Sequence, residues 1–101
     1  MYRASTPTFK IWLPYSKENV QEIVLTFKQM DEDVVILEKR LADVEWTTDT
    51  KFQFTLNQEE TNLFKFGKAR VQARVKTQNG KVIPSKMYYI DVNDVLNDEV
   101  L

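Results

Sequence analysis

The sequence of 101 residues contains no cysteine and no histidine. Disulfide frameworks, zinc fingers, thiol nucleophiles and any mechanism that needs an imidazole base are therefore excluded. No apolar run approaches the roughly 20 residues that a membrane helix needs, and the N-terminal residues lack the apolar centre of a signal peptide. We therefore expect no membrane partner and no signal peptide, in a protein that is intracellular or exported by another route.

The sequence also lacks an excess of either positive or negative charge. Fourteen basic and fifteen acidic side chains give a net charge of −1, which argues against strong attraction to nucleic acid or to a membrane surface. The apolar fraction is 43%, with six Phe, four Tyr and two Trp, so the chain has enough apolar side chains for a core. We expect one β-sandwich domain over residues 1–101.

Hydrophobic residues recur mainly with a period of two, which is typical of strands with one buried face. Between Lys68 and Lys76 every odd position is small or apolar and every even position is polar. Shorter stretches predict strands at 9–13, 34–38, 43–47 and 51–56, and the segment 81–92, rich in Val, Ile and Tyr, predicts the last strand. The strand phases predict that the following side chains are mostly buried: Phe27, Phe52, Phe54, Val71, Val75 and Ile90.

The segment 16–30 fits two patterns, a helical stripe that Ser16 would cap and an alternating strand. The β-branched and aromatic residues of 23–27 favour a strand over 22–29, preceded by a short turn at 16–20. One helical turn is predicted at 58–64, because Asn57 can cap it and two glutamates follow at its positive end. Together these elements predict an all-β, immunoglobulin-like two-sheet sandwich of about seven strands.

The pair Asn79-Gly80 predicts a two-residue type I′ turn between the last two strands. The resulting register sets Gln78 against Lys81, Val71 against Tyr88 and Lys68 against Asp91. It also places Pro84 in the ladder and Lys86 on the core face, and neither is compatible with regular pairing. We therefore predict a bulge or a break in pairing between Ile83 and Met87, which turns Lys86 outward.

Several stretches carry a resemblance to a known group of proteins. They are Thr6-Pro7-Thr8-Phe9 before Leu13-Pro14, then Val24 to Gln29, then Leu56, Gln58-Glu59-Glu60-Thr61 and Phe64, and finally Val71 to Thr77 with Gly80. Together they resemble small, largely uncharacterised proteins encoded among the structural and tail genes of phages and prophages of Gram-positive bacteria. The resemblance implies a virion-associated or assembly protein, located in the bacterial cytoplasm of an infected or lysogenic cell or in the virion.

Acidic residues offer the remaining route to catalysis or metal binding. Asp31-Glu32-Asp33 lacks the glycine and the distal glutamate of a calcium loop, which indicates a solvated turn. Glu59-Glu60 suits a helix start, and neither glycine belongs to a phosphate-binding motif. We therefore predict no catalytic, cofactor-binding or metal-binding residues, no small-molecule substrate, and a protein that is not an enzyme.

Positive charge is concentrated between residues 61 and 90, where seven Lys or Arg occur without an acidic residue. Four of them, Lys68, Arg70, Arg74 and Lys76, lie on one face of one predicted strand and are called the basic stripe below. The favoured interpretation is a solvated outer face that deters edge-to-edge pairing. Two alternatives stay open: a nucleic-acid backbone, or a salt-sensitive contact with acidic surface on a second copy or a neighbouring protein.

The candidate interaction surface combines exposed aromatic and sulfur-containing side chains with the basic stripe. It comprises Trp12, Tyr15, Lys68, Arg70, Arg74, Lys76, Met87 and Tyr89. From the strand pattern and the resemblance we predict a structural or adaptor module of a phage or prophage particle, acting through protein–protein contacts. Its expected partners are other copies of itself or other virion proteins. The alternative is a small nucleic-acid-binding protein that uses the basic hairpin at 65–86.

Overall fold

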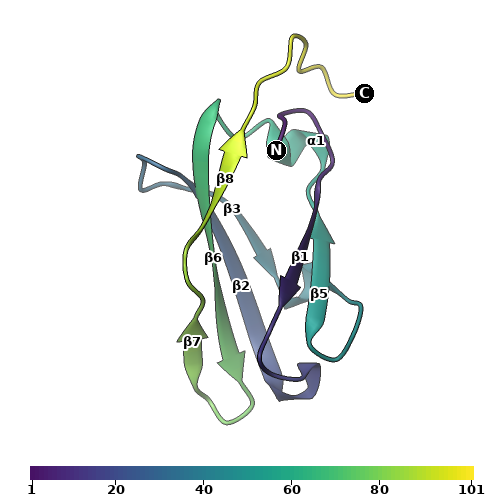
Figure 1. Cartoon of the computed structure of the whole chain (residues 1–101), viewed down its shortest axis with the longest axis vertical. Helices are drawn as coiled ribbons and strands as arrows, with labels where there is room; N and C mark the ends of the chain where they lie inside the picture. Colours follow the sequence, from purple (N-terminus) through teal and green to yellow (C-terminus); the bar gives the residue numbers. More distant parts are fainter.

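Two antiparallel sheets are packed as a sandwich in the computed structural model, which describes residues 1–101 (Figure 1). The larger sheet contains, in spatial order, β3 (Val35–Arg40), β2 (Val20–Gln29), β6 (Gly67–Thr77), and then β7 (Val82–Pro84) and β8 (Tyr88–Val92), which share one edge of β6. The smaller sheet contains β1 (Thr8–Trp12), β5 (Lys51–Thr55) and β4 (Glu45–Trp46). The predicted immunoglobulin-like sandwich is confirmed, with eight strands rather than about seven because the last strand is divided.

Helical structure is confined to short connections. The ambiguous segment forms a 3-10 turn, η1 (Lys17–Asn19), followed directly by β2, as predicted, and a second turn, η2 (Leu41–Asp43), follows β3. The predicted helical turn α1 spans Gln58–Thr61 and is capped reciprocally, because Asn57 and Glu60 each accept the other's backbone N–H at 2.8 and 2.9 Å. No helix is both long enough and apolar enough to cross a membrane.

The core lies between the sheets and is centred on Phe27, whose ring meets Phe9, Phe54 and Phe64 edge-on at 5.9–6.2 Å. Five of the six predicted core side chains are buried: Phe27, Phe52, Phe54, Val71 and Val75. Ile90 is only half-buried, because it belongs to β8 at the edge of the sheet, where no further strand covers it. The alternation in β6 therefore identified the inward face correctly.

The turn between β6 and β7 differs from the prediction. It has three residues, 78–80, since the Thr77 N–H donates to the Lys81 carbonyl at 2.8 Å. A type I′ turn needs a positive φ at both central residues, but only Gly80 has one, at +85°. The predicted pairing of Gln78 with Lys81 is therefore wrong, and β7 lies one position away from it, with Val75 opposite Ile83.

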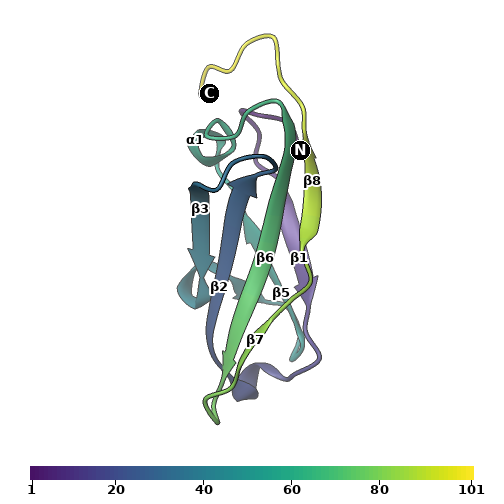
Figure 2. The same ribbon diagram turned by 90° about the vertical axis from the view of Figure 1, so that its left-hand side faces the viewer.

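Along β8 the predicted register is restored, with Val71 opposite Tyr88 and Lys68 opposite Asp91. The one-residue offset is absorbed between Ser85 and Tyr88, where two residues face Gln72 alone, which is a bulge. Figure 2 shows β7 and β8 following one another along the same edge of β6. The predicted irregularity is confirmed, and it leaves Lys86 exposed.

The N-terminal segment connects the two sheets at one end of the sandwich. Residues 1–3 run beside the end of β8, where the Asn93 N–H donates to the Met1 carbonyl at 2.7 Å and the Arg3 N–H donates to the Asn93 carbonyl at 2.9 Å. The chain then crosses to the smaller sheet and enters β1. At the crossing Ala4 has a φ of +53°, in the left-handed region that an alanine side chain disfavours.

Replacing Ala4 with glycine should raise the free energy of unfolding by about 0.5–1 kcal/mol. The strain of roughly 1–2 kcal/mol for a left-handed alanine is relieved, and the greater freedom of glycine in the unfolded chain offsets part of the gain. Ala42→Gly, in η2 where φ is not positive, is the control and should be destabilising. Urea unfolding of the three proteins measures the difference, and a loss of stability in both variants would contradict the strain.

Thr61 fixes α1 to the N-terminal segment from a fully buried position. Its Oγ1 accepts the Ser5 N–H at 3.1 Å and lies 3.0 Å from the Ser5 carbonyl oxygen, to which it can donate. Thr61→Val keeps the shape of the side chain but removes the hydroxyl, which leaves the Ser5 N–H without a partner. The substitution should therefore lower the free energy of unfolding by about 1–3 kcal/mol. Thr6→Val, at an exposed position, is the control. In urea unfolding its midpoint should equal that of the wild type, while the midpoint of Thr61→Val should fall.

Candidate functional site

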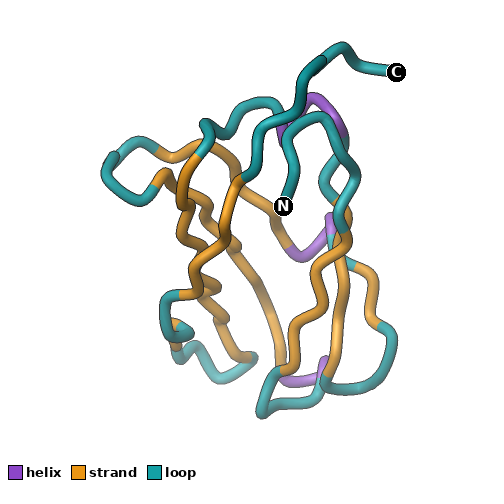
Figure 3. The backbone as a smooth tube through the Cα atoms, turned by 45° about the horizontal axis from the view of Figure 1, so that its top comes forward, coloured by secondary structure: helices purple, strands orange, loops and turns teal.

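One long side of the sandwich is open, between β1 and the edge formed by β7 and β8. β1 pairs only with β5, while β7 and β8 pair only with β6, so no strand joins the two sheets there. The two layers stand apart in Figures 1 and 3, and the N-terminus lies between them at one end. Core side chains next to this side therefore have no strand above them.

A cleft of about 380 Å³ occupies the open side. Its floor includes the core residues Leu25, Val71 and Val75, and its walls include Leu13 from the β1 side and Ile83 from β7. A second hollow of about 450 Å³ continues along β1 towards β8 and shares four lining residues with the first, Ile11, Trp12, Val71 and Tyr88. The two hollows together are called the seam below, and each has the size of an ordinary ligand pocket.

The backbone of β1 presents unpaired groups to the seam side. The Leu13 N–H donates to the Thr50 carbonyl and the Pro7 carbonyl accepts the Leu56 N–H, so the odd positions of β1 bond with β5. In an antiparallel ladder the alternate residues turn their N–H and C=O groups away, here those of Thr8, Lys10 and Trp12. This edge can therefore accept the hydrogen bonds of another strand.

The opposite edge is less suited to pairing. In β7 the outward-facing Pro84 has no N–H, and the bulge before Tyr88 interrupts the edge. In the middle of β8 only Tyr89 turns its backbone N–H and C=O groups away from β6, because the backbone groups of Tyr88 and Ile90 form the hydrogen bonds with β6. The continuous edge of the seam is therefore β1.

The charged side chains that line the seam are lysines alone, Lys10 and Lys86. The Lys86 Nζ lies 5.5 Å from the centre of the Tyr88 ring, and the Lys51 Nζ lies 4.7 Å from that of Trp12. These cation–π contacts hold positive charge at the rim of an otherwise apolar groove.

Three of the predicted interaction residues, Trp12, Tyr15 and Tyr89, line the seam. Met87 lies apart from them, on the outer face of the larger sheet beside Arg70. Residues that sequence reasoning missed include Ile11, Ile83 and Tyr88; each looks like an ordinary strand residue, and only the juxtaposition of β1 with β7 and β8 distinguishes it.

The basic stripe lies on the outer face of the larger sheet and is not a continuous positive surface. Lys68 forms an ion pair with Asp91 at 3.4 Å, and Arg70 donates to the Glu32 carbonyl at 3.0 Å and lies 3.8 Å from Asp33. Arg74 and Lys76 have no such partner. Lys68 and Arg70 therefore have acidic partners within the chain, and Arg74 and Lys76 have none.

The acidic turn at 31–33 pairs with several neighbouring cations, of which Arg70 alone belongs to the basic stripe. A hydrogen bond from Lys28 holds the pKa of Asp33 below its usual value, and a hydrogen bond to Glu32 raises the pKa of Lys65. The turn is thus an anchor for neighbouring cations. Nowhere does the structure gather three or more His, Cys, Asp or Glu side chains that could hold a metal ion.

Among known proteins, similarity to this chain is found with solved structures. No family model and no curated protein matches it. The crystal structure of CopC from Methylosinus trichosporium OB3b is similar, with a TM-score of 0.58 over 95% of this chain and 85% of that chain, at 13% sequence identity. This likeness agrees with the β-sandwich class of fold.

The predicted function as a phage structural or adaptor module is contradicted by this comparison, because the structural neighbour is CopC and not a phage structural module. The strand and turn patterns that suggested the resemblance are the patterns that build any sandwich of this kind. The alternative of nucleic-acid binding through 65–86 is also dropped, because half of the basic stripe is paired within the chain.

Proposed function

We propose that the protein binds an extended polypeptide segment in the seam, as a strand added to β1. The observation that carries the proposal is an apolar cleft beside the free edge of β1, of which Lys10 and Trp12 line the seam. In strand addition, backbone hydrogen bonds supply affinity and pockets select alternate side chains. The seam offers both in one place.

The shape of the seam favours a chain over a compact molecule. Its two hollows share four lining residues and follow the chain from Phe9 in β1 to Tyr15, three residues beyond the end of β1, so a compact ligand would fill only one of them. Lysines at the rim and the absence of carboxylates favour a segment with acidic residues between its apolar ones. The same absence leaves the seam without an acid–base pair, which supports a binding role and not a catalytic one.

A blocked eight-residue peptide of alternating valine and glutamate tests the proposal. Titrated into the labelled protein, it should slow the exchange of the Thr8, Lys10 and Trp12 amide hydrogens, because these donate to the added strand. A valine–lysine peptide of the same length should bind at least about tenfold more weakly at low ionic strength. Equal binding of the two peptides would contradict the assigned charge preference.

A proline at position 10 isolates the contribution of the edge. Lys10→Pro removes one outward N–H without breaking a hydrogen bond to β5, so the sandwich should fold while peptide binding is lost. Lys10→Thr removes the same charge but keeps the N–H, and it should retain most of the binding. If the seam takes up a small apolar dye such as anilinonaphthalene sulfonate but neither peptide, the proposal is wrong.

A further inference from the structure

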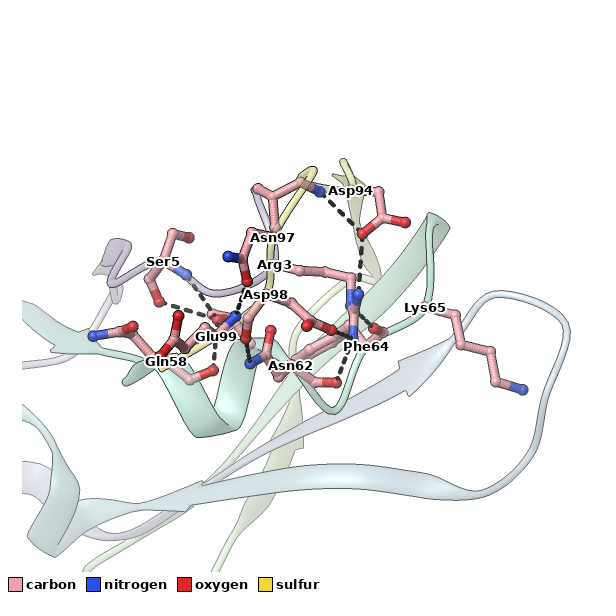
Figure 4. Close-up of polar contacts among 12 residues, drawn as sticks. Arg3, Ser5, Gln58, Asn62, Phe64, Lys65, Asp94, Asn97, Asp98 and Glu99 are labelled. Atoms are coloured by element: carbon pink, nitrogen blue, oxygen red, sulfur yellow. Dashed lines mark hydrogen bonds and ion pairs between the residues drawn. The ribbon is translucent and has the colours of Figure 1, made fainter. Parts of the chain in front are cut away.

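The C-terminal tail, residues 93–101, leaves β8 and extends beyond the end of the sandwich (Figure 1). Polar contacts hold it to the rest of the chain: the Arg3 guanidinium lies 3.0 Å from Asp94 and 3.3 Å from Asp98 (Figure 4), and the Gln58 side chain forms hydrogen bonds with the Leu101 backbone. Leu96 and Leu101 are fully exposed. The tail thus carries large apolar side chains that its own sandwich does not cover.

The tail and the seam are complementary in composition. Residues 94–101 contain four apolar and three acidic side chains and no basic one, namely Val95, Leu96, Val100 and Leu101 with Asp94, Asp98 and Glu99. The seam is apolar with a lysine rim.

The tail does not reach its own seam in this conformation. The position beside the end of β8, where a tail folded straight back would lie, is taken by Met1–Arg3. Arg3, Asn62 and Gln58 hold the tail towards α1 instead. A second copy has no such obstacle. Asp94 and Asp98 are each more than half exposed and can exchange Arg3 for the neighbour's lysines, while Arg3 keeps its hydrogen bonds to the Phe64 and Asn62 carbonyls.

We infer that the seam takes the C-terminal tail of a second copy of this chain, an inference that rests on the proposed strand addition. The contact is head-to-tail: each copy offers a tail at one end and a seam on one side. Such contacts continue from copy to copy unless the geometry closes a ring. The protein should therefore assemble with rising concentration, and more weakly at about 1 M salt than at about 0.01 M because the lysine contacts are screened.

Two variants of the full chain separate the two halves of the contact. A tail variant, Leu96→Ser with Leu101→Ser, keeps the seam, and a seam variant, Lys10→Pro with Lys86→Glu, keeps the tail. All four positions are exposed, so both variants should fold. Light scattering should show each variant alone as a monomer, and an equimolar mixture as a dimer of twice the 11.9 kDa chain mass that grows no further. Val34→Ser, exposed in a distant turn, is the control and should assemble like the wild type.

The outcomes distinguish the inference from the proposed function. If the valine–glutamate peptide binds but the wild type stays monomeric and the mixture forms no dimer, the inference is wrong and the peptide-binding function stands. A monomer whose Thr8, Lys10 and Trp12 amides are already protected would place the tail in its own seam and would also overturn the second copy as occupant. If neither the peptide nor the tail binds, both the proposed peptide-binding function and the inferred contact between copies are wrong.

Discussion

Replacing Phe27 with alanine should lower the free energy of unfolding by about 3–5 kcal/mol. The side chain is fully buried, and the rings of Phe9, Phe54 and Phe64 surround it, so its removal leaves a cavity between the sheets. The three neighbours belong to β1, β5 and the segment after α1, which cannot all move inward together. The cost should therefore lie well above that of a typical substitution.

Urea unfolding followed by far-UV circular dichroism measures this loss. Phe66→Ala is the matched control, because Phe66 is 71% exposed, and it should change stability by no more than about 0.5 kcal/mol. A similar small effect for Phe27→Ala would mean that the centre of the core lies elsewhere.

Gln29→Met should cost about 2–3 kcal/mol, although it preserves the length of the side chain. Gln29 is buried at the end of β2, where its amide donates to the carbonyls of Lys65 and Lys68 and accepts the Lys65 N–H, at 3.0–3.1 Å. A methionine cannot replace these bonds and would leave the Lys65 N–H unpaired. The chain entering β6 would lose its attachment to β2.

Gln21→Met, on the same strand but exposed, provides the control and should be close to neutral. Hydrogen exchange gives an additional readout, because the Lys65 amide should become labile in Gln29→Met and stay protected in the control. Unchanged protection would show that the loop is held by other contacts.

Local patterns were sufficient to predict most of the sandwich. Alternation gave the inward face of β6, and the composition of 23–27 correctly favoured a strand over a helix. The hairpin turn was mispredicted because Asn79-Gly80 is compatible with two-residue and three-residue loops, and only the sign of φ at Asn79 separates them. The bulge was predictable because Pro84 and Lys86 cannot occupy regular core-facing ladder positions.

The candidate site was much less accessible to sequence reasoning. Trp12, Tyr15 and Tyr89 were selected for their residue types, and nothing in the sequence says that β1 and β8 face each other across an open side. Within the basic stripe, the contact of Lys68 with Asp91 follows from the predicted register, but that of Arg70 with Asp33 does not, because Asp33 lies far away in the chain. Both features depend on contacts between distant segments, which one sequence does not reveal.

The central position of β6 has a consequence for synthesis on the ribosome. β2 pairs with β6 along nearly its whole length, yet Thr77 follows Gln29 by 48 residues. At about 5–20 residues per second, β2 therefore waits some 2–10 s for its partner, with Ile23, Leu25 and Phe27 uncovered. During this interval the nascent chain should be at its most vulnerable to aggregation, and a chaperone that binds apolar strands should protect it best.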